Sequence, residues 1–149
     1  MRIVLDIETN LAHDKIHLVV TKDIDTGEVR KWKHQNGLAD YLNKATLLIA
    51  HNGIAFDFKL LNSLWKTKIR LNQVYDTLIV SRLLDPSREK GHKLEAWGNT
   101  LGLHKIDYPA VWQWMMDRKE EYKNECFDYP IDNLLTDYCI RDVEVTAKL

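Results

Sequence analysis

Two carboxylates, Asp6 and Glu8, close an apolar stretch at the start of the chain, from position 2 to position 9. Because side chains alternate along a β-strand, both acids would lie on one face of it. Burying two neighbouring carboxylates costs free energy, because they lose hydration and because they repel each other. A divalent cation that takes their oxygens as ligands offsets both costs. The pair therefore indicates either a metal site or the capped or solvated end of a strand.

The spacing of these acids is uninformative by itself, but their context is not. The acid-x-acid pattern occurs at Asp6/Glu8, Asp23/Asp25 and Asp142/Glu144. With 22 acidic residues in 149, chance alone predicts about three occurrences. Only the first pair ends an apolar, strand-like run. The second lies beside a turn signal at 25–27 and is expected at a solvated hairpin turn.

Two further sets of polar residues have spacings that suit chemistry. Asn52 and Asp57 follow the apolar segment 46–50 across a Gly turn, and functional groups in open α/β sheets gather at the carboxyl ends of strands. Tyr138 and Asp142 are four residues apart in the last expected helix, so both side chains lie on one helix face. Taken by itself, this last set is either part of a site or a plain hydrogen-bonded pair.

The elements that must position these residues follow an α/β pattern. Alternating or wholly apolar segments predict strands at 2–9, 16–23, 28–33, 46–50 and 74–76. Helical spacing of apolar residues predicts helices at 36–43, 54–65, 77–84, 92–101, 110–123 and 132–149. We therefore expect a mixed sheet of three antiparallel strands followed by parallel strands, flanked by helices, in an α/β fold of the ribonuclease-H-like kind.

Length and composition predict one domain spanning residues 1–149. The chain is 45% hydrophobic and 29% charged, which suffices for a full core. No apolar run reaches membrane-spanning length and no signal-peptide pattern is present, so we expect a cytoplasmic protein with no membrane partner. Cys126 and Cys139 fit no CxxC spacing and are expected as free thiols. A formal net charge of −1 argues against a protein that coats nucleic acid.

The three sets of polar residues together resemble a known family. Asp6-x-Glu8, Asn52-x4-Asp57 and Tyr138-x3-Asp142 follow the order of the three motifs of the DEDD (DnaQ-like) 3′–5′ exonucleases, and the tyrosine is typical of the tyrosine branch. The chain closely resembles the proofreading exonuclease domain of family A DNA polymerases from podovirus-type phages. This resemblance runs nearly from end to end and rests on the stretches DIETN, HNGIAFDFKLL, YDTLIVSRLL, HKLEAWGNTLG and DYCIRDVEVT.

The resemblance implies a metal-dependent exonuclease that releases nucleoside monophosphates from the 3′ end of single-stranded DNA. Two Mg²⁺ or Mn²⁺ ions held by four carboxylates would activate a water and stabilise the leaving oxygen. Asp6 is expected to bridge both ions, Glu8 and Asp142 to complete the nucleophile-side site, and Asp57 to hold the second ion through water. Tyr138 is expected to orient the attacking water.

Substrate contacts are expected beside this site. The resemblance places Thr9 against the terminal nucleotide, Leu11 or Ala12 as an apolar wedge between the last two bases, and Asn52 against the 3′ end or the ribose. Three aromatic residues are expected either to stack on bases or to lie in the core, namely Tyr108, Trp112 and Trp114. Three basic residues are expected either to meet phosphates or to lie in a solvated loop, namely Arg88, Lys90 and Lys93.

The related phage polymerases continue into a polymerase domain, whereas this sequence ends at Leu149. We therefore expect either an excised domain or a free-standing subunit whose partner is a separately encoded DNA polymerase, in the cytoplasm of an infected cell if a phage encodes it. Two other functions stay open. One is an exoribonuclease of the same superfamily. The other is a non-catalytic module that binds nucleic acid or a polymerase, a class that usually lacks one or more of the metal carboxylates.

Overall fold

A mixed five-stranded sheet forms the centre of the computed structural model, which describes residues 1–149 except 11, 105, 107–112 and 114–132, and describes only the backbone of residues 133 and 134. The strands are β1 (Arg2–Thr9), β2 (Ile16–Asp23), β3 (Val29–Trp32), β4 (Leu47–Ala50) and β5 (Val74–Asp76), in the spatial order β3-β2-β1-β4-β5. β1, β2 and β3 pair antiparallel, whereas β4 is parallel to β1 and to β5. The predicted α/β class and mixed sheet are confirmed, and the arrangement is compatible with a ribonuclease-H-like fold.

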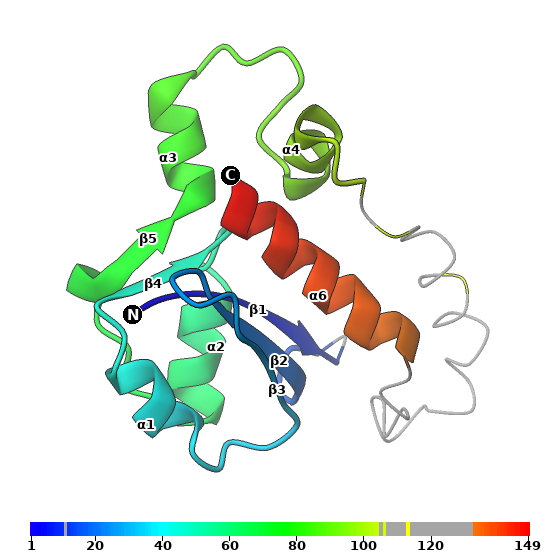
Figure 1. The fold of residues 1–149 in the computed structure, drawn as a ribbon. Coiled ribbons are helices and arrows are strands. Elements are labelled where there is room, and N and C mark those ends of the chain that lie inside the picture. Colours follow the sequence, from blue (N-terminus) through cyan, green and yellow to red (C-terminus); the bar gives the residue numbers. More distant parts are fainter. Residues whose placement is uncertain (11, 105, 107–112, 114–132) are drawn as a thin grey trace.

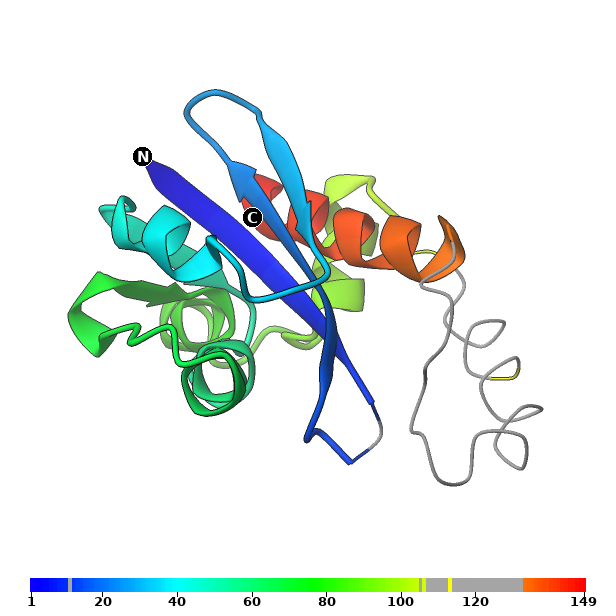
Figure 2. The ribbon, with the colours of Figure 1, turned by 90° about the horizontal axis from the view of Figure 1, so that it is seen from below.

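Helices cover both faces of this sheet (Figures 1 and 2). They are α1 (Leu38–Asn43), α2 (Asp57–Leu64), α3 (Thr77–Leu84), α4 (Leu94–Leu101) and α6 (Asn133–Lys148), with a short 3-10 turn η1 (Leu71–Gln73) before β5. Figure 2 shows β1 with α1 and α2 on one side and α6 on the other. Among the described residues, no helix is both long and apolar enough to cross a lipid bilayer.

β1 is the middle strand of the sheet, and its apolar residues are buried in two separate cores. Ile3, Leu5 and Ile7 are buried in the core under α1 and α2. Val4, on the other face, is buried in a second core that includes Cys139 of α6. By the same alternation, the two acids of β1 share the face of Val4 and are directed toward α6.

Helix α6 packs across β1, β2 and β4. Its apolar residues Cys139 and Val143 enter the second core, in which both are fully buried. On the flank of the helix, Nζ of Lys22 in β2 donates to both carboxylate oxygens of Glu144, at 2.8 and 2.7 Å. This ion pair and the buried face together fix the rotation of α6, and therefore which of its side chains reach β1.

The turn after β4 requires a glycine. A Cβ atom at Gly53 would lie 2.5 Å from Cβ of Ala50 and 2.6 Å from Cε2 of Phe58, closer than any side chain tolerates. This close approach packs the turn against the start of α2. The helix expected from residue 54 therefore begins only at Asp57, after residues 51–56 have completed the turn.

Other boundaries also differ from expectation: α1 begins at Leu38 rather than at residue 36, β3 is one residue shorter at each end, and β4 begins one residue later. Helix α4 begins at Leu94 rather than at residue 92, because His92 turns back to contact α3 through a hydrogen bond to Ser81. The helix expected at 110–123 lies outside the described residues, apart from Gln113.

Candidate metal and active site

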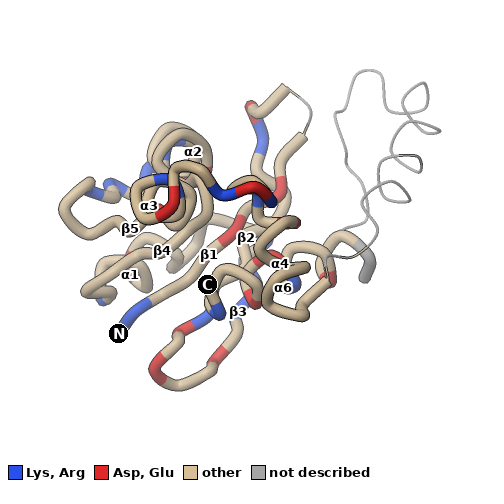
Figure 3. The backbone as a smooth tube through the Cα atoms, turned by 90° about the horizontal axis from the view of Figure 1, so that it is seen from above, with Lys and Arg blue, Asp and Glu red and all other residues tan. Residues whose placement is uncertain are grey.

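Asp6 and Glu8 lie together near the carboxyl end of β1, on the face that α6 covers. One oxygen of each carboxylate and the Sγ atom of Cys139 all lie within 4.8 Å of one another. The pairing register with β2 shifts between Glu8 and Thr9, so regular pairing ends at this point. Figure 3 shows the acidic part of β1 between α2 and α6. The end of the central strand thus presents a close group of cation ligands.

Asp57 reaches the same strand from the opposite layer of the fold. It is the first residue of α2 and is only 3% exposed. Its Oδ1 atom accepts a hydrogen bond of 3.2 Å from the backbone N–H of Ile7, the residue between Asp6 and Glu8. The helix dipole also favours a negative charge at this N-terminal position. The turn that Gly53 permits therefore delivers a third carboxylate to β1.

Helix α6 supplies the fourth carboxylate and the tyrosine. Asp142 and Tyr138 are both buried, one helical turn apart. Between them, the S–H group of Cys139 lies 3.3 Å from Oδ2 of Asp6 and 3.5 Å from its backbone oxygen. Asp142 follows Cys139 by three residues on the same side of the helix, and it is near enough to Asp6 to raise the pKa of that carboxyl. The structure thus brings together the four carboxylates that the sequence singled out.

Burial and mutual repulsion make this group of acids hard to ionise. The pKa of Asp6 is raised well above its usual range, first by loss of hydration and then by the charges of Asp57, Asp142 and Glu8. The pKa of Asp57 is raised to about 7 mainly by burial, which outweighs the lowering effect of its backbone hydrogen bonds, and the charges of Asp76 and Asp142 raise it further by smaller amounts. An added cation would reverse both effects, since it offsets the lost hydration and the repulsion at once.

The donor set fits hard divalent cations. Asp6, Glu8, Asp57 and Asp142 offer oxygen ligands, which Mg²⁺ and Mn²⁺ prefer. Cys139 is the soft donor of the group, but burial, followed by the nearby charge of Asp6, raises the pKa of its thiol well above the usual value. The thiol therefore stays protonated and acts as a neutral hydrogen-bond donor to Asp6. Cys139 was expected only as a free thiol, although its place three residues before Asp142 was a usable signal.

Thr9 and its neighbours connect the end of β1 to the residue that precedes Asp57. The Thr9 hydroxyl contacts Nδ1 of His13 at 2.8 Å, and the His13 ring meets the ring of Phe56 edge-on at 5.0 Å between centroids. Phe56 immediately precedes Asp57, so these contacts join the loop after β1 to the start of α2. Sequence reasoning missed His13 and Phe56. Leu11, the expected wedge, lies outside the described residues, as do Tyr108, Trp112 and Trp114.

Asp76 has a structural place near the site. One or the other of its carboxylate oxygens accepts hydrogen bonds from the backbone N–H groups of Asn52 and Ile54, both at 3.0 Å. Oδ1 also accepts from the N–H groups of Leu78 and Ile79 at the start of α3. Asp76 thus ties the turn after β4 to the next helix, and it holds Asn52 in a left-handed conformation with φ of 66°.

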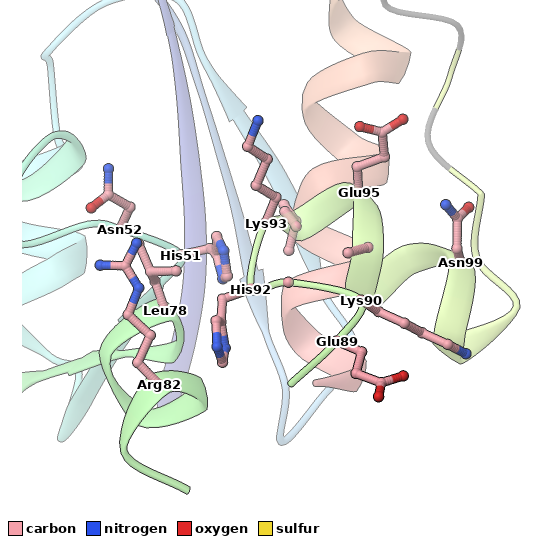
Figure 4. Close-up of a pocket in the computed structure, with 13 residues that line it drawn as sticks. His51, Asn52, Leu78, Arg82, Glu89, Lys90, His92, Lys93, Glu95 and Asn99 are labelled. Atoms are coloured by element: carbon pink, nitrogen blue, oxygen red, sulfur yellow. The ribbon is translucent and has the colours of Figure 1, made fainter. Parts of the chain in front are cut away.

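Asn52 opens onto a cavity of about 760 Å³ between α3 and α4 (Figure 4). Its lining includes His51 and Asn52 from the turn after β4, Leu78 and Arg82 from α3, and residues 89–96 and 99 from the loop before α4 and from α4 itself. Lys90 and Lys93, which were expected to meet phosphates or solvent, both line it, whereas Arg88 stacks over the ring of Trp97 at 3.9 Å. The cavity is therefore a feature next to the turn after β4 that sequence spacing did not reveal.

Comparison with known proteins relates the chain to DNA polymerases. It is 28% identical over 182 aligned residues to the DNA-directed DNA polymerase of Enterobacteria phage T3, and 29% identical over 182 to that of Escherichia phage T7. Each alignment covers 99% of the chain but 26% of the relative, so the chain spans about a quarter of these polymerases. The PolC-type DNA polymerase III of Ureaplasma parvum is 34% identical over 99 residues, which are 59% of the chain and 7% of that relative. No protein-family model matches.

Proposed function

We propose that the chain is a metal-dependent 3′–5′ exonuclease that removes nucleoside monophosphates from single-stranded DNA ends. The observation that carries this proposal is the convergence of Asp6, Glu8, Asp57 and Asp142 from β1, α2 and α6 at the end of the central strand. The similarity to phage DNA polymerases supports a role in DNA synthesis, for which removal of a wrongly added 3′ nucleotide is a fitting reaction.

The acidic group would hold two Mg²⁺ or Mn²⁺ ions. Divalent ions in such a site lower the pKa of a water and stabilise the charge that develops on the leaving oxygen. Asp6 lies in the middle of the group, since the charges of Glu8, Asp57 and Asp142 all act on it, and we assign it the bridging position. Glu8 and Asp142 would complete one ion site, and Asp57 would serve the other.

The other residues would position the substrate and the water. The Tyr138 hydroxyl, one turn before Asp142, would orient the attacking water by a hydrogen bond. It is a weak base because an ordinary tyrosine has a pKa near 10. Thr9 would contact the terminal nucleotide at the end of β1, and Asn52 would contact the ribose or the 3′ end from the rim of the cavity.

We also propose a DNA polymerase as the partner of this activity. The support is the similarity along 99% of the chain to two phage DNA polymerases. A polymerase that misincorporates would supply the frayed 3′ end that the acidic group is suited to cleave. Mixing the chain with a candidate polymerase and measuring the mass of the complex by light scattering would test this, and two unshifted masses would contradict it.

The function itself is tested with strands labelled at the 5′ end. Single-stranded DNA, a duplex with a mismatched 3′ end, and RNA of the same sequence are incubated with Mg²⁺ or with EDTA. We expect a ladder of DNA products that shorten from the 3′ end, only with the metal present. Faster shortening of the RNA would move the assignment to an exoribonuclease. Tight binding without cleavage of either strand would identify a non-catalytic module.

A further inference from the structure

We propose that the cavity between α3 and α4 binds the phosphodiester backbone of the single strand that leads to the cleaved 3′ end, with Arg82 and Lys93 as the phosphate ligands. The inference rests on the proposed exonuclease function and adds to it a binding track outside the acidic group. It would make the affinity of the protein depend on the length of the strand as well as on its terminal nucleotide.

The cavity begins at the turn that follows β4, the strand that pairs with β1. In the parallel pairing of β1 with β4, Val4 lies opposite Ile49. β4 ends at Ala50, and an extension of this register by two residues would bring His51, which lines the cavity together with Asn52, to the level of Asp6. A single-stranded DNA whose last phosphodiester lies at Asp6 can therefore pass over His51 and Asn52 into the cavity.

Arg82 and Lys93 are the cations available at this end of the cavity. Figure 4 shows the Arg82 guanidinium pointing toward Asn52, and the Lys93 amine extending to the same side as Asn52, whereas Lys90 and Glu89 point to the opposite end. Both side chains are exposed, and within the described part of the chain neither has an ion pair or a side-chain hydrogen bond. The lining also contains Glu89 and Glu95, so with three basic residues its formal charge is +1 (3 − 2).

The walls of the cavity are held in place by contacts of their own. The Ser81 hydroxyl on α3 accepts a hydrogen bond of 2.9 Å from Nε1 of Trp97 on α4, and it lies 2.7 Å from Nδ1 of His92. Arg88 stacks on the same Trp97 ring and donates to Thr100, which fixes the loop before α4. The backbone positions of Arg82 and Lys93 are thus set before any ligand binds, so the ordering cost of binding falls mainly on their two side chains.

A phosphodiester backbone suits this arrangement better than an apolar ligand or a cation. Two cations on opposite walls, neither of them ion-paired among the described residues, can each meet a phosphate of an extended nucleic-acid strand, and such contacts position a nucleic acid without reading its sequence. Each neutralised phosphate of a single strand releases counterions, which changes the slope of log K against log salt concentration by about 0.7. Loss of the two phosphate contacts should therefore change the salt slope by a set amount, which an unfolded or distorted variant would not reproduce.

The test measures binding of thymidine oligonucleotides by fluorescence anisotropy in Mg²⁺, with a phosphorothioate at the 3′-terminal linkage to keep them intact. We expect Arg82→Ala/Lys93→Ala to bind the decamer about 5- to 30-fold more weakly than the unsubstituted protein, and to lower its salt slope by about 1.4. Dinucleotide and thymidine monophosphate affinities should change less than about twofold. Arg82→Lys/Lys93→Arg should restore decamer binding, and a variant without two distant exposed cations, Lys31→Ala/Lys33→Ala, should match the unsubstituted protein.

Unchanged decamer affinity and salt slope in Arg82→Ala/Lys93→Ala would overturn the inference. An equal loss of thymidine monophosphate binding would also overturn it, because the cavity would then hold a free nucleotide. Failure of the proposed function gives a different result. If decamer binding depends on Arg82 and Lys93 but 5′-labelled DNA is not cleaved, the binding track stands and the exonuclease is rejected. If DNA is cleaved normally and Arg82→Ala/Lys93→Ala binds the decamer as the unsubstituted protein does, only the track is rejected.

Discussion

The S–H group of Cys139 lies 3.3 Å from Oδ2 of Asp6, joining helix α6 to the central strand across 133 positions of sequence. Cys139 is fully buried in the core between α6 and the sheet. Its hydrogen bond lowers the pKa of Asp6, against the larger effects of burial and neighbouring acids that raise it. The thiol thus supports both the orientation and the charge of the carboxylate at the middle of the acidic group.

Replacing this thiol should weaken metal binding as well as the fold. Cys139→Ala leaves a small cavity and should lower the free energy of unfolding by about 1–2 kcal/mol. It should also raise the pKa of Asp6 and weaken Mn²⁺ binding several-fold, measured by isothermal titration calorimetry. Val145→Ala, also fully buried on α6, is the matched control and should lose stability but keep its Mn²⁺ affinity. Equal Mn²⁺ affinity in both variants would contradict the role of the thiol.

The raised pKa values predict how stability depends on pH without metal. Asp57 has a pKa of about 7 in the folded protein against a usual value of 3.8, so the folded state binds its proton more tightly. Its contribution to stability is complete below about pH 4 and is lost as the pH rises to about 7, with a slope of up to about 1.4 kcal/mol per pH unit. In EDTA, urea denaturation should show this decline.

Asp57→Asn should flatten the decline and leave the metal-free protein more stable than the unsubstituted chain at pH 8, because the amide cannot ionise. Saturating Mg²⁺ should reverse the order by stabilising only the unsubstituted chain, by about 2.7 kcal/mol at 100 times the dissociation constant. Lower stability of Asp57→Asn at pH 8 in EDTA would show that the carboxylate is not strained by burial.

Replacing two acids of α6 that lie two residues apart by their amides should have very different effects on the cleavage rate. Asp142 is buried beside Asp6, whereas Glu144 pairs with Lys22 at the flank of the helix. Asp142→Asn should lower the cleavage rate at least about 1,000-fold, because a lost metal ligand removes charge that the reaction needs. Glu144→Gln should stay within about twofold and cost at most about 1 kcal/mol of stability, since the ion pair is partly exposed. A large rate loss in Glu144→Gln would contradict the assignment.

Variants of Tyr138 and Asp6 should have different effects, because we assign Tyr138 to orientation of the attacking water and Asp6 to metal binding. Tyr138→Phe should slow cleavage by about 10- to 100-fold without changing Mn²⁺ affinity, because it removes one hydrogen bond to the water. Asp6→Ala should abolish both cleavage and tight Mn²⁺ binding. Single-turnover cleavage and calorimetry of the two variants distinguish these roles, and an equal loss of rate in both would refute the division.

Much of this fold follows from local patterns. Strands β1, β2 and β5 have the bounds that the sequence predicts, and α6 ends one residue before its predicted end, at Lys148. β1, β2 and α6 are long enough to have a clear hydrophobic pattern, which is the primary secondary-structure signal in a sequence. The late start of α2 was not predictable in this way, because it depends on the close packing of Gly53 against Ala50 and Phe58.

The candidate site, like the fold, was predictable from sequence only where it depends on local patterns. The carboxylates could be identified because their spacing on β1 and α6 and their place after β4 are local properties that match known motifs. The contact of Cys139 with Asp6 and the hydrogen bonds of Asp76 to the turn after β4 join residues far apart in sequence. Such contacts depend on how α6 and β5 pack on the sheet, and no spacing rule within one element encodes them.

The most direct test of the account is single-turnover cleavage of 5′-labelled single-stranded DNA, measured across a Mg²⁺ titration for the unsubstituted protein and for Asp6→Asn. Asp6→Asn keeps the shape of the side chain and removes the charge at the middle of the acidic group. We predict removal of one nucleotide at a time from the 3′ end, dependent on Mg²⁺ and at least about 1,000-fold slower in the variant. Cleavage that proceeds in EDTA, begins inside the strand, or survives Asp6→Asn would contradict the central claim.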